Sequence, residues 1–345
     1  MCIDPISVYY FQYKQVSGHE GIVGRLSETE IVNLLPRVIE VATPEIYPPG
    51  SIVWYADELT PEEIERCQWL TFLTQIDTLV WEDGTGNQDQ WLAEILRKDY
   101  DAFCAFVESG ASQPVLKLDK DWVATIAPQV FDYQSPARQS PYLIRAMLNL
   151  TYNAGPIDRV LDPMGGYGQT LFECVLRGVD GATLEISPTA SKRSAENLRK
   201  LLQRLGRHFE ESHDGTRHLF VTCDAPQNRY QIINGDTREA HRYLPEQQFD
   251  SLITDFPYGV RAGSRSEKLT PIPLDELLDA ALPSWKRLLK PNGTIVVAYN
   301  LKTLQRGTVL DLIQKHGFRQ RFADSDLRER ISGQIHRDII AFEKA

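Results

Sequence analysis

A glycine-rich turn is the first place where this sequence could bind a ligand. It lies in the run Val160-Leu161-Asp162-Pro163-Met164-Gly165-Gly166-Tyr167-Gly168, between an expected strand and an expected helix. Glycines in such a turn let the backbone adopt positive φ and approach a ligand closely. The candidate binding residues of the turn are Asp162, Pro163, Gly165, Gly166 and Gly168.

Acidic side chains follow the next two expected strands as well. Glu185 ends the strand after the turn, and Asp236 follows the next strand in Asn234-Gly235-Asp236. The carboxyl ends of parallel strands share one edge of a sheet, where α/β folds bind ligands, and an acid there can accept hydrogen bonds from ribose hydroxyls. An acidic pocket suits a cofactor with a cationic end, so we expect S-adenosylmethionine.

The main alternative ligand at this turn is a dinucleotide such as NAD. The G-x-G-x-x-G fingerprint of dinucleotide-binding folds would need glycine where Leu171 stands, which disfavours that alternative. A single strand-end acid is more often a helix cap or a loop residue than a ligand contact. The interpretation as a cofactor site therefore depends on the combination and its spacing.

A second motif follows a later strand. Residues 251–254 run into Asp255-Phe256-Pro257-Tyr258, which resembles the D-P-P-Y motif of amino-group methyltransferases with Phe256 in place of the first proline. Taken alone, this pattern is as often a turn in which the aspartate accepts local backbone hydrogen bonds. Its place in the chain after the glycine-rich turn favours a catalytic function.

Residues 133–344 as a whole resemble the tRNA guanine-10 N2-methyltransferase family, whose members usually carry an N-terminal THUMP region. The matching pieces are residues 133–138, 141–150, 162–170, 255–263, 289–293 and His336-Arg337. The resemblance implies a Rossmann-like fold, S-adenosylmethionine as cofactor and guanine N2 in tRNA as methyl acceptor. It also places Arg138 near the methionine end of the cofactor.

Asp255, Pro257 and Tyr258 are the residues that we expect to be catalytic. The lone pair of an exocyclic amine is delocalised into the base, so the amine is a poor nucleophile. A carboxylate at Asp255 and a backbone carbonyl at Phe256 or Pro257 can accept its two N–H bonds and let the nitrogen become pyramidal. Tyr258 can stack on a base that has left its helical stack.

These residues require a sheet that brings several strand ends together. From residue 138 onward helices and strands alternate regularly, which favours an α/β fold with a mostly parallel sheet covered on both faces. We expect strands at 159–161, 181–185, 230–234, 251–254, 294–298, 319–323 and 336–343, and helices at 141–152, 170–177, 189–205, 274–289 and 309–316. Residues 206–229 are longer than a βαβ connection requires, and we expect an inserted hairpin there. The basic row on the helix at 189–205 is interpreted as a solvated face.

The first part of the chain has a different pattern, typical of an α+β domain. Short β-rich runs occur at 6–13, 52–55 and 78–81, and helical patterns at 28–41 and 91–98. Ser27 and Glu30 have the spacing of a capping box, which predicts that a helix begins after Ser27. The stretch 115–132 has no strong period and is expected to cross between domains.

Charge divides the chain in the same place. Residues 1–130 contain 8 Lys and Arg against 21 Asp and Glu, whereas residues 131–345 contain 29 against 26. We therefore expect an acidic N-terminal domain at 1–130 and a methyltransferase domain at 131–345. A net charge of −13 is unsuited to neutralising tRNA phosphates, so the first domain is either a diverged THUMP-like fold or the binding surface for a protein partner.

Composition excludes several other classes. No stretch approaches the roughly 18 apolar residues of a membrane span, and the first residues lack the basic start of a signal peptide, so we expect a cytoplasmic protein. The five cysteines are widely spaced and suggest neither a disulfide framework nor a metal site.

Two other functions stay open at this point. The first is the same chemistry on another acceptor, either adenine N6 in DNA or RNA or a glutamine amide, because the net charge of +3 in the second half is low for a free-standing nucleic-acid binder. The second is a methyltransferase-like subunit without activity that serves as a scaffold, which Phe256 and the acidic first domain would suit.

Overall fold

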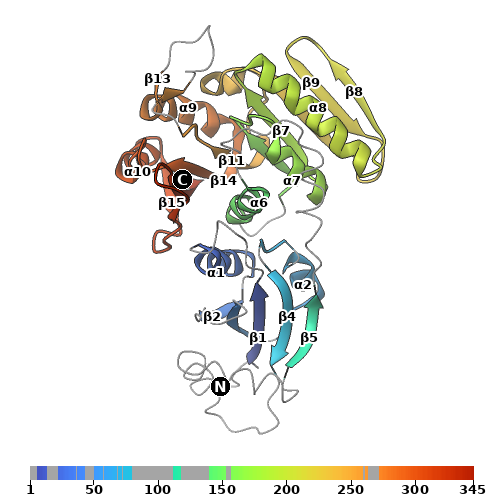
Figure 1. The fold of residues 1–345 in the computed structure, drawn as a ribbon, viewed down its shortest axis with the longest axis vertical. Coiled ribbons are helices and arrows are strands. Elements are labelled where there is room, and N and C mark those ends of the chain that lie inside the picture. Colours follow the sequence, from blue (N-terminus) through green and yellow to red (C-terminus); the bar gives the residue numbers. More distant parts are fainter. Residues whose placement is uncertain are drawn as a thin grey trace. The chain divides into compact units, whose positions relative to one another are not determined.

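A computed structural model describes two units, Met1–Asp121 and Trp122–Ala345. The described residues are 6–13, 22–35, 37–42, 50–56, 58–67, 69–71, 73–79, 112–117, 140–152, 157–258, 261–262 and 272–345. Arg138, the predicted helix at 91–98 and most of the stretch 115–132 lie outside these residues. Each unit is described separately (Figure 1).

The second unit is built on one large mixed sheet. Its strand order is β15-β17-β14-β11-β6-β7-β10-β9-β8, and β16 pairs with β17. The strands are β6 (Arg159–Asp162), β7 (Asp180–Glu185), β8 (Phe209–His213), β9 (Arg217–Thr222), β10 (Arg229–Asn234), β11 (Phe249–Asp255), β14 (Leu289–Asn300), β15 (Phe318–Arg321), β16 (Glu329–Arg330) and β17 (His336–Lys344). The five strands from β14 to β10 are mutually parallel, and the strands outside them are antiparallel. The predicted α/β fold is thus confirmed.

The chain order of the parallel strands creates a switch point in the middle of this sheet. From β6 the chain adds β7 and β10 on one side, and it then returns to add β11 and β14 on the other. Connections on the two sides of β6 therefore diverge, and α/β folds bind ligands in the crevice at such a point, beyond the carboxyl ends of the strands. Asp162 ends β6 and Asp255 ends β11, so both lie at this switch point.

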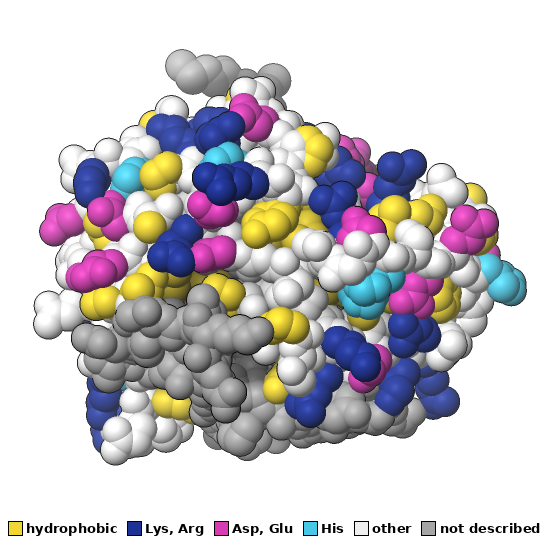
Figure 2. Space-filling model, turned by 90° about the horizontal axis from the view of Figure 1, so that it is seen from above, with side chains coloured by type: hydrophobic (Ala, Val, Ile, Leu, Met, Phe, Trp, Pro, Cys, Tyr) yellow, Lys and Arg dark blue, Asp and Glu magenta, His cyan; other side chains and the backbone are white. Residues whose placement is uncertain are grey.

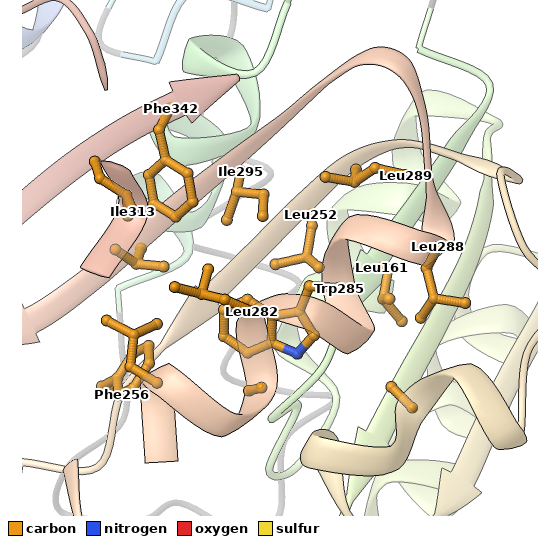
Figure 3. Close-up of a cluster of buried hydrophobic side chains, with 14 of the residues drawn as sticks. Leu161, Leu252, Phe256, Leu282, Trp285, Leu288, Leu289, Ile295, Ile313 and Phe342 are labelled. Carbon is orange, nitrogen blue, oxygen red and sulfur yellow. The ribbon is translucent and has the colours of Figure 1, made fainter. Parts of the chain in front are cut away.

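Helices cover both faces of the sheet. They are α6 (Pro141–Leu150), α7 (Gln169–Arg177), α8 (Pro188–Arg204), the short 3-10 helix η2 (Thr237–Arg242), α9 (Leu274–Leu288) and α10 (Arg306–Lys315). Helices α9 and α10 pack through a large apolar cluster that includes Trp285, Leu252 and Ile295 (Figure 3). Helices α6, α7 and α8 contact one another in series on the other face, where the hydroxyl of Thr151 after α6 lies 2.6 Å from that of Ser251.

The helices and strands predicted from residue 138 onward are confirmed to within a few residues, apart from a longer β14. The inserted segment 206–229 forms the antiparallel hairpin β8–β9, which extends the sheet beyond β10. Arg199 on α8 is bound by Glu211 of this hairpin at 2.6 Å. The described residues also include the two-stranded ribbon β12 (Arg261–Ala262) and β13 (Ile272–Pro273).

The first unit has a five-stranded antiparallel sheet of order β2-β3-β1-β4-β5. Its elements are β1 (Ile6–Tyr13), α1 (Val23–Leu34), β2 (Val38–Ala42), β3 (Gly50–Ala56), α2 (Pro61–Cys67), β4 (Leu73–Leu79) and β5 (Ser112–Lys117). Strand β5 occupies the start of the stretch that was expected to be an irregular crossing, so that part of the prediction is wrong.

The capping box predicted at Ser27 and Glu30 is also wrong. Both residues lie inside α1, which begins at Val23 and ends at Leu34. The buried Glu30 carboxylate instead accepts hydrogen bonds from the backbone N–H and the hydroxyl of Thr71. The Glu30 side chain, which the local pattern assigned to a helix cap, therefore binds a residue 41 positions away in the sequence.

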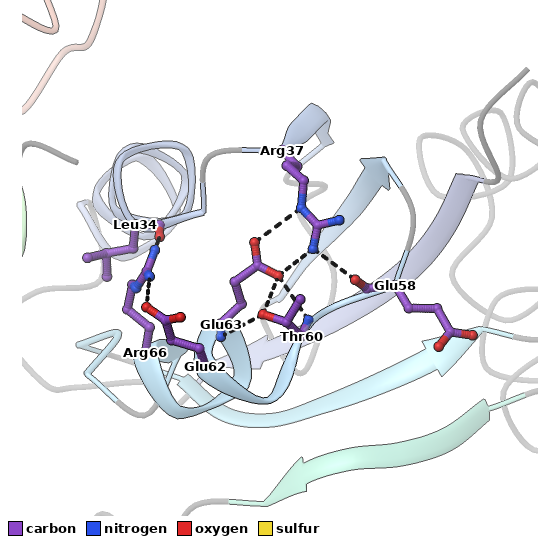
Figure 4. Close-up of polar contacts among 7 residues, drawn as sticks. All are labelled: Leu34, Arg37, Glu58, Thr60, Glu62, Glu63 and Arg66. Carbon is purple, nitrogen blue, oxygen red and sulfur yellow. Dashed lines mark hydrogen bonds and ion pairs between the residues drawn. The ribbon is translucent and has the colours of Figure 1, made fainter. Parts of the chain in front are cut away.

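A capping box does occur at α2, where Thr60 and Glu63 have the same spacing. The Glu63 carboxylate accepts the Thr60 N–H at 2.9 Å, and the Glu63 N–H donates to the Thr60 hydroxyl at 3.3 Å (Figure 4). Arg37 adds an ion pair to Glu63 at 2.6 Å, which offsets the cost of burying that carboxylate. No helix among the described residues has the length and apolar character needed to cross a membrane.

Candidate active site

The glycine-rich turn between β6 and α7 is held tightly against its neighbours. The Gly165 N–H donates to the Leu184 carbonyl of β7 at 2.9 Å. A Cβ at Gly165 would lie 1.5 Å from the Thr183 hydroxyl oxygen, and one at Gly168 would lie 2.3 Å from the Ser194 hydroxyl oxygen of α8. These positions therefore require glycine because the turn lies directly on β7 and α8.

Two glycines of this turn also have backbone conformations that other residues rarely adopt. Gly166 has φ +51° and Gly168 has φ +84°, and both values lie in the left-handed region that favours glycine. A Cβ at Gly166 would meet nothing within 4 Å. The turn is thus packed against β7 at Gly165 and against α8 at Gly168, whereas Gly166 has free space on its Cβ side.

Asp162 is the buried centre of this turn. Its carboxylate accepts hydrogen bonds from the Thr170 hydroxyl at 2.6 Å, the Met164 N–H at 3.1 Å and the Thr254 hydroxyl at 3.1 Å. Burial raises the pKa of Asp162 to about 6, against the lowering effect of these hydrogen bonds. Because Thr254 lies on β11 next to Asp255, its bond to Asp162 joins the two strand ends at the switch point.

Glu185 lies at the end of β7 and is tied to the same turn. Its carboxylate accepts the Gly166 N–H at 3.0 Å and the Ser187 N–H at 2.7 Å, which leaves other lone pairs available. Burial raises its pKa, and the negative charge of Asp162 adds to that rise. Next to it, Ile186 is an exposed large hydrophobic residue, 37% exposed, which the sequence analysis did not single out.

Asp236 lies at the same edge of the sheet, but its carboxylate has a local partner. It caps η2 through the Arg238 N–H at 2.9 Å and forms an ion pair with the Arg238 guanidinium at 2.5 Å. Burial would raise the pKa of Asp236, but these contacts outweigh it and hold the pKa below its ordinary value. In the described part of the chain the Asp236 carboxylate is bound by Arg238 and not by Asp162 or Glu185, so the three acids predicted at the cofactor edge do not form one cluster.

Asp255 has the most unusual environment of the predicted site residues. Its Oδ1 atom is buried and has no hydrogen-bond partner among the described residues. Burial raises the pKa of Asp255 to about 7, with the negative charge of Asp162 adding to the rise and Arg337 and Tyr258 opposing it. Buried polar atoms are almost always paired, so an unpaired carboxylate oxygen at the carboxyl end of β11 is a candidate for contact with a ligand.

Phe256 stands where the D-P-P-Y motif has proline, and it does two things that proline cannot do. Its N–H donates to the Ala298 carbonyl of β14 at 2.8 Å, so it extends the pairing of β11 with β14. Its ring is 2% exposed and packs edge-on against Trp285 at 6.3 Å between centroids. The substitution therefore anchors the end of β11 in the core directly after Asp255.

Tyr258 is held by a residue from a strand far along the chain. The Arg337 Nε donates to the Tyr258 Oη at 3.0 Å, and the guanidinium lies over the tyrosine ring at 5.8 Å from its centroid. Arg337 is in turn paired with Glu329 at 2.9 Å. Pro257, between Phe256 and Tyr258, is exposed.

The structure thus gathers most of the predicted site residues at the carboxyl edge of β6, β7 and β11. The sequence analysis missed Thr254, Ile186 and Glu329, and it named Arg337 only as part of a matching segment. Glu329 had no signal in the sequence, because nothing local distinguishes it from a surface acid. Within the described residues, no group of three or more His, Cys, Asp or Glu side chains could hold a metal ion.

The residues present fit S-adenosylmethionine. Asp162 is buried and Glu185 is half-buried, and the negative charge of Asp162 raises the pKa of Glu185, so a cationic ligand nearby would offset the cost of keeping both charged. The backbone is open at Gly166, and the exposed Ile186 follows Glu185 directly. An acid, a bare backbone segment and an apolar side chain are the contacts that a ribose, an amino acid end and a flat base require.

Comparison with known proteins gives the class and the family. The family model described as RMKL-like, methyltransferase domain, matches residues 128–324 of this chain, which is more than half of it. The fold and the family match are those of an S-adenosylmethionine-dependent methyltransferase. The chain belongs to the family of RMKL-like methyltransferase domains, and the predicted enzyme class and cofactor are confirmed.

A curated relative carries a more specific name. The tRNA (guanine(10)-N2)-dimethyltransferase of Methanothermobacter thermautotrophicus is 30% identical over 208 residues, which cover 59% of this chain and 47% of the relative. The chain therefore spans about half the length of the curated relative that it matches.

Solved structures with a similar fold are more distant in sequence. TrmN from Thermus thermophilus is 14% identical with a TM-score of 0.48, covering 98% of this chain and 100% of that one. The N-methyltransferase NodS from Bradyrhizobium japonicum, in complex with S-adenosyl-L-homocysteine, is 10% identical with a TM-score of 0.41, covering 64% of this chain and 98% of that one.

Proposed function

We propose that this methyltransferase acts on the exocyclic N2 amine of guanine in tRNA. The single observation that carries the proposal is the buried, unpaired Oδ1 of Asp255 at the switch point. This atom is a hydrogen-bond acceptor that no described residue pairs. The 30% identity with a tRNA guanine N2-methylating relative supports the choice of acceptor.

In this proposal, the acidic edge binds the cofactor, which supplies the methyl group. Glu185 accepts hydrogen bonds from ribose hydroxyls, and Ile186 packs on the adenine. The turn formed by Asp162, Pro163, Gly165, Gly166 and Gly168 holds the amino acid end, together with Arg138. Asp236 contributes only if its pair with Arg238 opens, because Arg238 occupies its carboxylate.

Asp255 orients the amine that accepts the methyl group. Its Oδ1 accepts one N–H, and a backbone carbonyl at Phe256 or Pro257 accepts the other, so that the nitrogen lone pair is released from the ring. Tyr258 stacks on the flipped guanine. After transfer, the excess proton passes to Asp255, whose pKa of about 7 suits a group that both accepts and releases a proton near neutral pH.

The test is transfer of labelled methyl from S-adenosylmethionine to tRNA that lacks its own modifications, with nuclease digestion to identify the product. We expect labelled N2-methylguanosine, and Asp255→Ala should lower the rate by about 100-fold to 1,000-fold without weakening cofactor binding. Glu276→Gln changes an exposed residue of α9 and is a control outside the site, so it should leave the rate within a few-fold of wild type.

Other outcomes would redirect the proposal. Labelled N6-methyladenosine or labelled glutamine would replace guanine N2 as the acceptor. Cofactor binding without transfer to any acceptor would favour the scaffold function. The net charge of −13 in residues 1–130 supports the prediction of a protein partner for that part, and adding a cell extract that restores transfer would point to such a partner.

A further inference from the structure

A line of polar side chains leads from the far edge of the sheet into the site. Glu329 on β16 and Arg337 on β17 are directly opposite partners in the strand register, and their side chains form an ion pair at 2.9 Å. Both residues are only 5% exposed. Arg337 then donates through Nε to the Tyr258 Oη at 3.0 Å.

The next member of this line is Asp255. The Tyr258 hydroxyl and the positive charge of Arg337 both lower the pKa of Asp255 and so favour its carboxylate form. Burial raises the pKa of Tyr258, so its hydroxyl stays protonated. Tyr258 therefore accepts a hydrogen bond from Arg337 and keeps its own proton.

A buried ion pair of this kind is weak evidence for a role in stability alone. Burying two charges costs more than burying two apolar side chains of similar volume, and replacing such a pair by apolar residues is often neutral or stabilising. The pair joins β16, a strand of only two residues, to β17. The buried Arg337 guanidinium lies over the Tyr258 ring. Its positive charge also lowers the pKa of Asp255.

We propose that Arg337 is a positioning residue of the active site, which holds the Tyr258 ring and supplies a positive charge beside it, and that Glu329 fixes the Arg337 side chain and limits that charge. This inference rests on the proposed function of Asp255 as an acceptor. It assigns a role to two residues outside both motifs of the sequence.

The charged and titratable groups that face Asp255 in the described structure come from three elements besides its own strand. Asp162 at the end of β6 opposes ionisation, whereas Arg337 on β17 and Tyr258 in the following loop favour it. Glu329 stands behind Arg337 on β16. Removing Arg337 must therefore disfavour the carboxylate, whereas removing the charge of Glu329 must favour it, because the guanidinium is then uncompensated.

The experiment measures two things as a function of pH in the full chain. One is the single-turnover rate of methyl transfer to tRNA, and the other is the carboxyl ¹³C shift of Asp255, assigned with Asp255→Asn. Wild type should show a midpoint near pH 7 in both. Arg337→Met should raise the midpoint by about one pH unit, and Glu329→Gln should lower it.

Arg337→Lys separates charge from geometry. It keeps the positive charge but loses the planar Nε donor to the Tyr258 Oη. We expect a midpoint close to wild type with a rate reduced about tenfold, at nearly unchanged KM for S-adenosylmethionine. This variant also keeps the test open if Arg337→Met does not fold.

Arg306→Met is the matched control. Arg306 pairs at 2.8 Å with the buried Asp338, which follows Arg337 in β17 and so faces the other side of the sheet. This variant should lose thermal stability without moving either midpoint. Midpoints that stay fixed in Arg337→Met and Glu329→Gln, or that move in the same direction, would overturn the inference. A wild-type protein that transfers no methyl group would overturn the proposed function alone, because the ¹³C titration still reports on Arg337.

Discussion

At the scale of single residues, the active site depends on a carboxylate that is expensive to keep. Asp255 has no hydrogen-bond partner at Oδ1 within the described structure, and its pKa is about 7 instead of 3.8. An acceptor that must bind a substrate N–H cannot be satisfied by the protein itself. Keeping this acceptor unpaired for a substrate therefore lowers the stability of the folded chain.

Replacing this carboxylate by an amide should stabilise the folded chain. Between pH 4 and pH 7, folded Asp255 holds a proton that the unfolded chain has lost, so the stability that the group contributes falls as pH rises through this window. Asp255→Asn should therefore be more stable than wild type by roughly 2 kcal/mol at pH 8, and equal to it near pH 4. Chemical denaturation at the two pH values measures this.

Asp311→Asn on α10 is the control for this prediction. Asp311 is exposed, and removing its charge should change stability by less than about 0.5 kcal/mol at either pH. An Asp255→Asn variant that is less stable than wild type at pH 8 would show that the groups favouring the carboxylate outweigh the cost of burying it.

At the scale of elements, the turn between β6 and α7 works because its backbone lies directly on β7. A Cβ at Gly165 would lie 1.5 Å from the Thr183 hydroxyl, so Gly165→Ala must lift the turn away from the strand. We expect at least a tenfold loss of S-adenosylmethionine affinity in calorimetry, because a displacement of this size misplaces every backbone contact of the turn.

Gly307→Ala is the matched control for the turn. Gly307 lies in α10, where a Cβ meets nothing within 4 Å, and alanine favours a helix over glycine by up to about 1 kcal/mol. That variant should bind the cofactor as wild type does. Unchanged affinity in Gly165→Ala would place the cofactor away from this turn.

The end of β11 is a second element whose stability can be tested. Phe256→Ala keeps the N–H bond to Ala298 and loses the buried ring, which should cost about 3–5 kcal/mol. Phe256→Pro restores the usual motif but loses both the ring and the hydrogen bond, so it should be the less stable of the two. Denaturation curves of both variants test the order.

If Phe256→Pro were as stable as wild type, neither the Phe256 ring nor the Phe256 backbone N–H would anchor β11. Phe256 would then be expected to contact the substrate instead of stabilising the core.

At the scale of the whole molecule, charge is distributed unfavourably for a strong nucleic-acid binder. Residues 131–345 carry a net charge of only +3, and residues 1–130 carry −13. On the face shown in Figure 2, Lys and Arg side chains are interspersed with Asp and Glu. A surface with this balance of charges makes few uncompensated phosphate contacts, so under the proposed function tRNA binding should depend little on counterion release.

The salt dependence of tRNA binding should be correspondingly shallow. A protein with 6–10 phosphate contacts loses about 10³-fold to 10⁵-fold in affinity between 50 and 200 mM salt, and we expect a loss below about 100-fold here. Filter binding or fluorescence titration over that range measures it. Lys192→Glu on the exposed face of α8 should leave the slope unchanged, and a slope steeper by several contacts would show that a basic track exists.

Much of the catalytic half could be predicted from the sequence, because its signals are local. The alternation of strands and helices after residue 138, the glycine-rich turn and the strand-end acids Asp162, Glu185 and Asp255 follow from neighbours in the chain. Two residues show the limit of such signals. The capping box predicted at Ser27 is wrong, and the carboxylate of Asp236 is bound by Arg238 instead of facing the cofactor site. A short polar motif does not say which of several partners its side chain will choose.

The sequence by itself determined the class of fold, the order of the two motifs and the kind of ligand that an acidic strand edge favours. Only the tertiary structure decided that Thr254 joins Asp162 to the neighbouring strand, that Phe256 belongs to the core, and that Glu329 and Arg337 stand behind Tyr258. Arg337 and Tyr258 are 79 positions apart in the sequence, and Thr254 and Asp162 are 92 positions apart. Strand pairing across a sheet fixes such contacts, and no spacing along the chain encodes them.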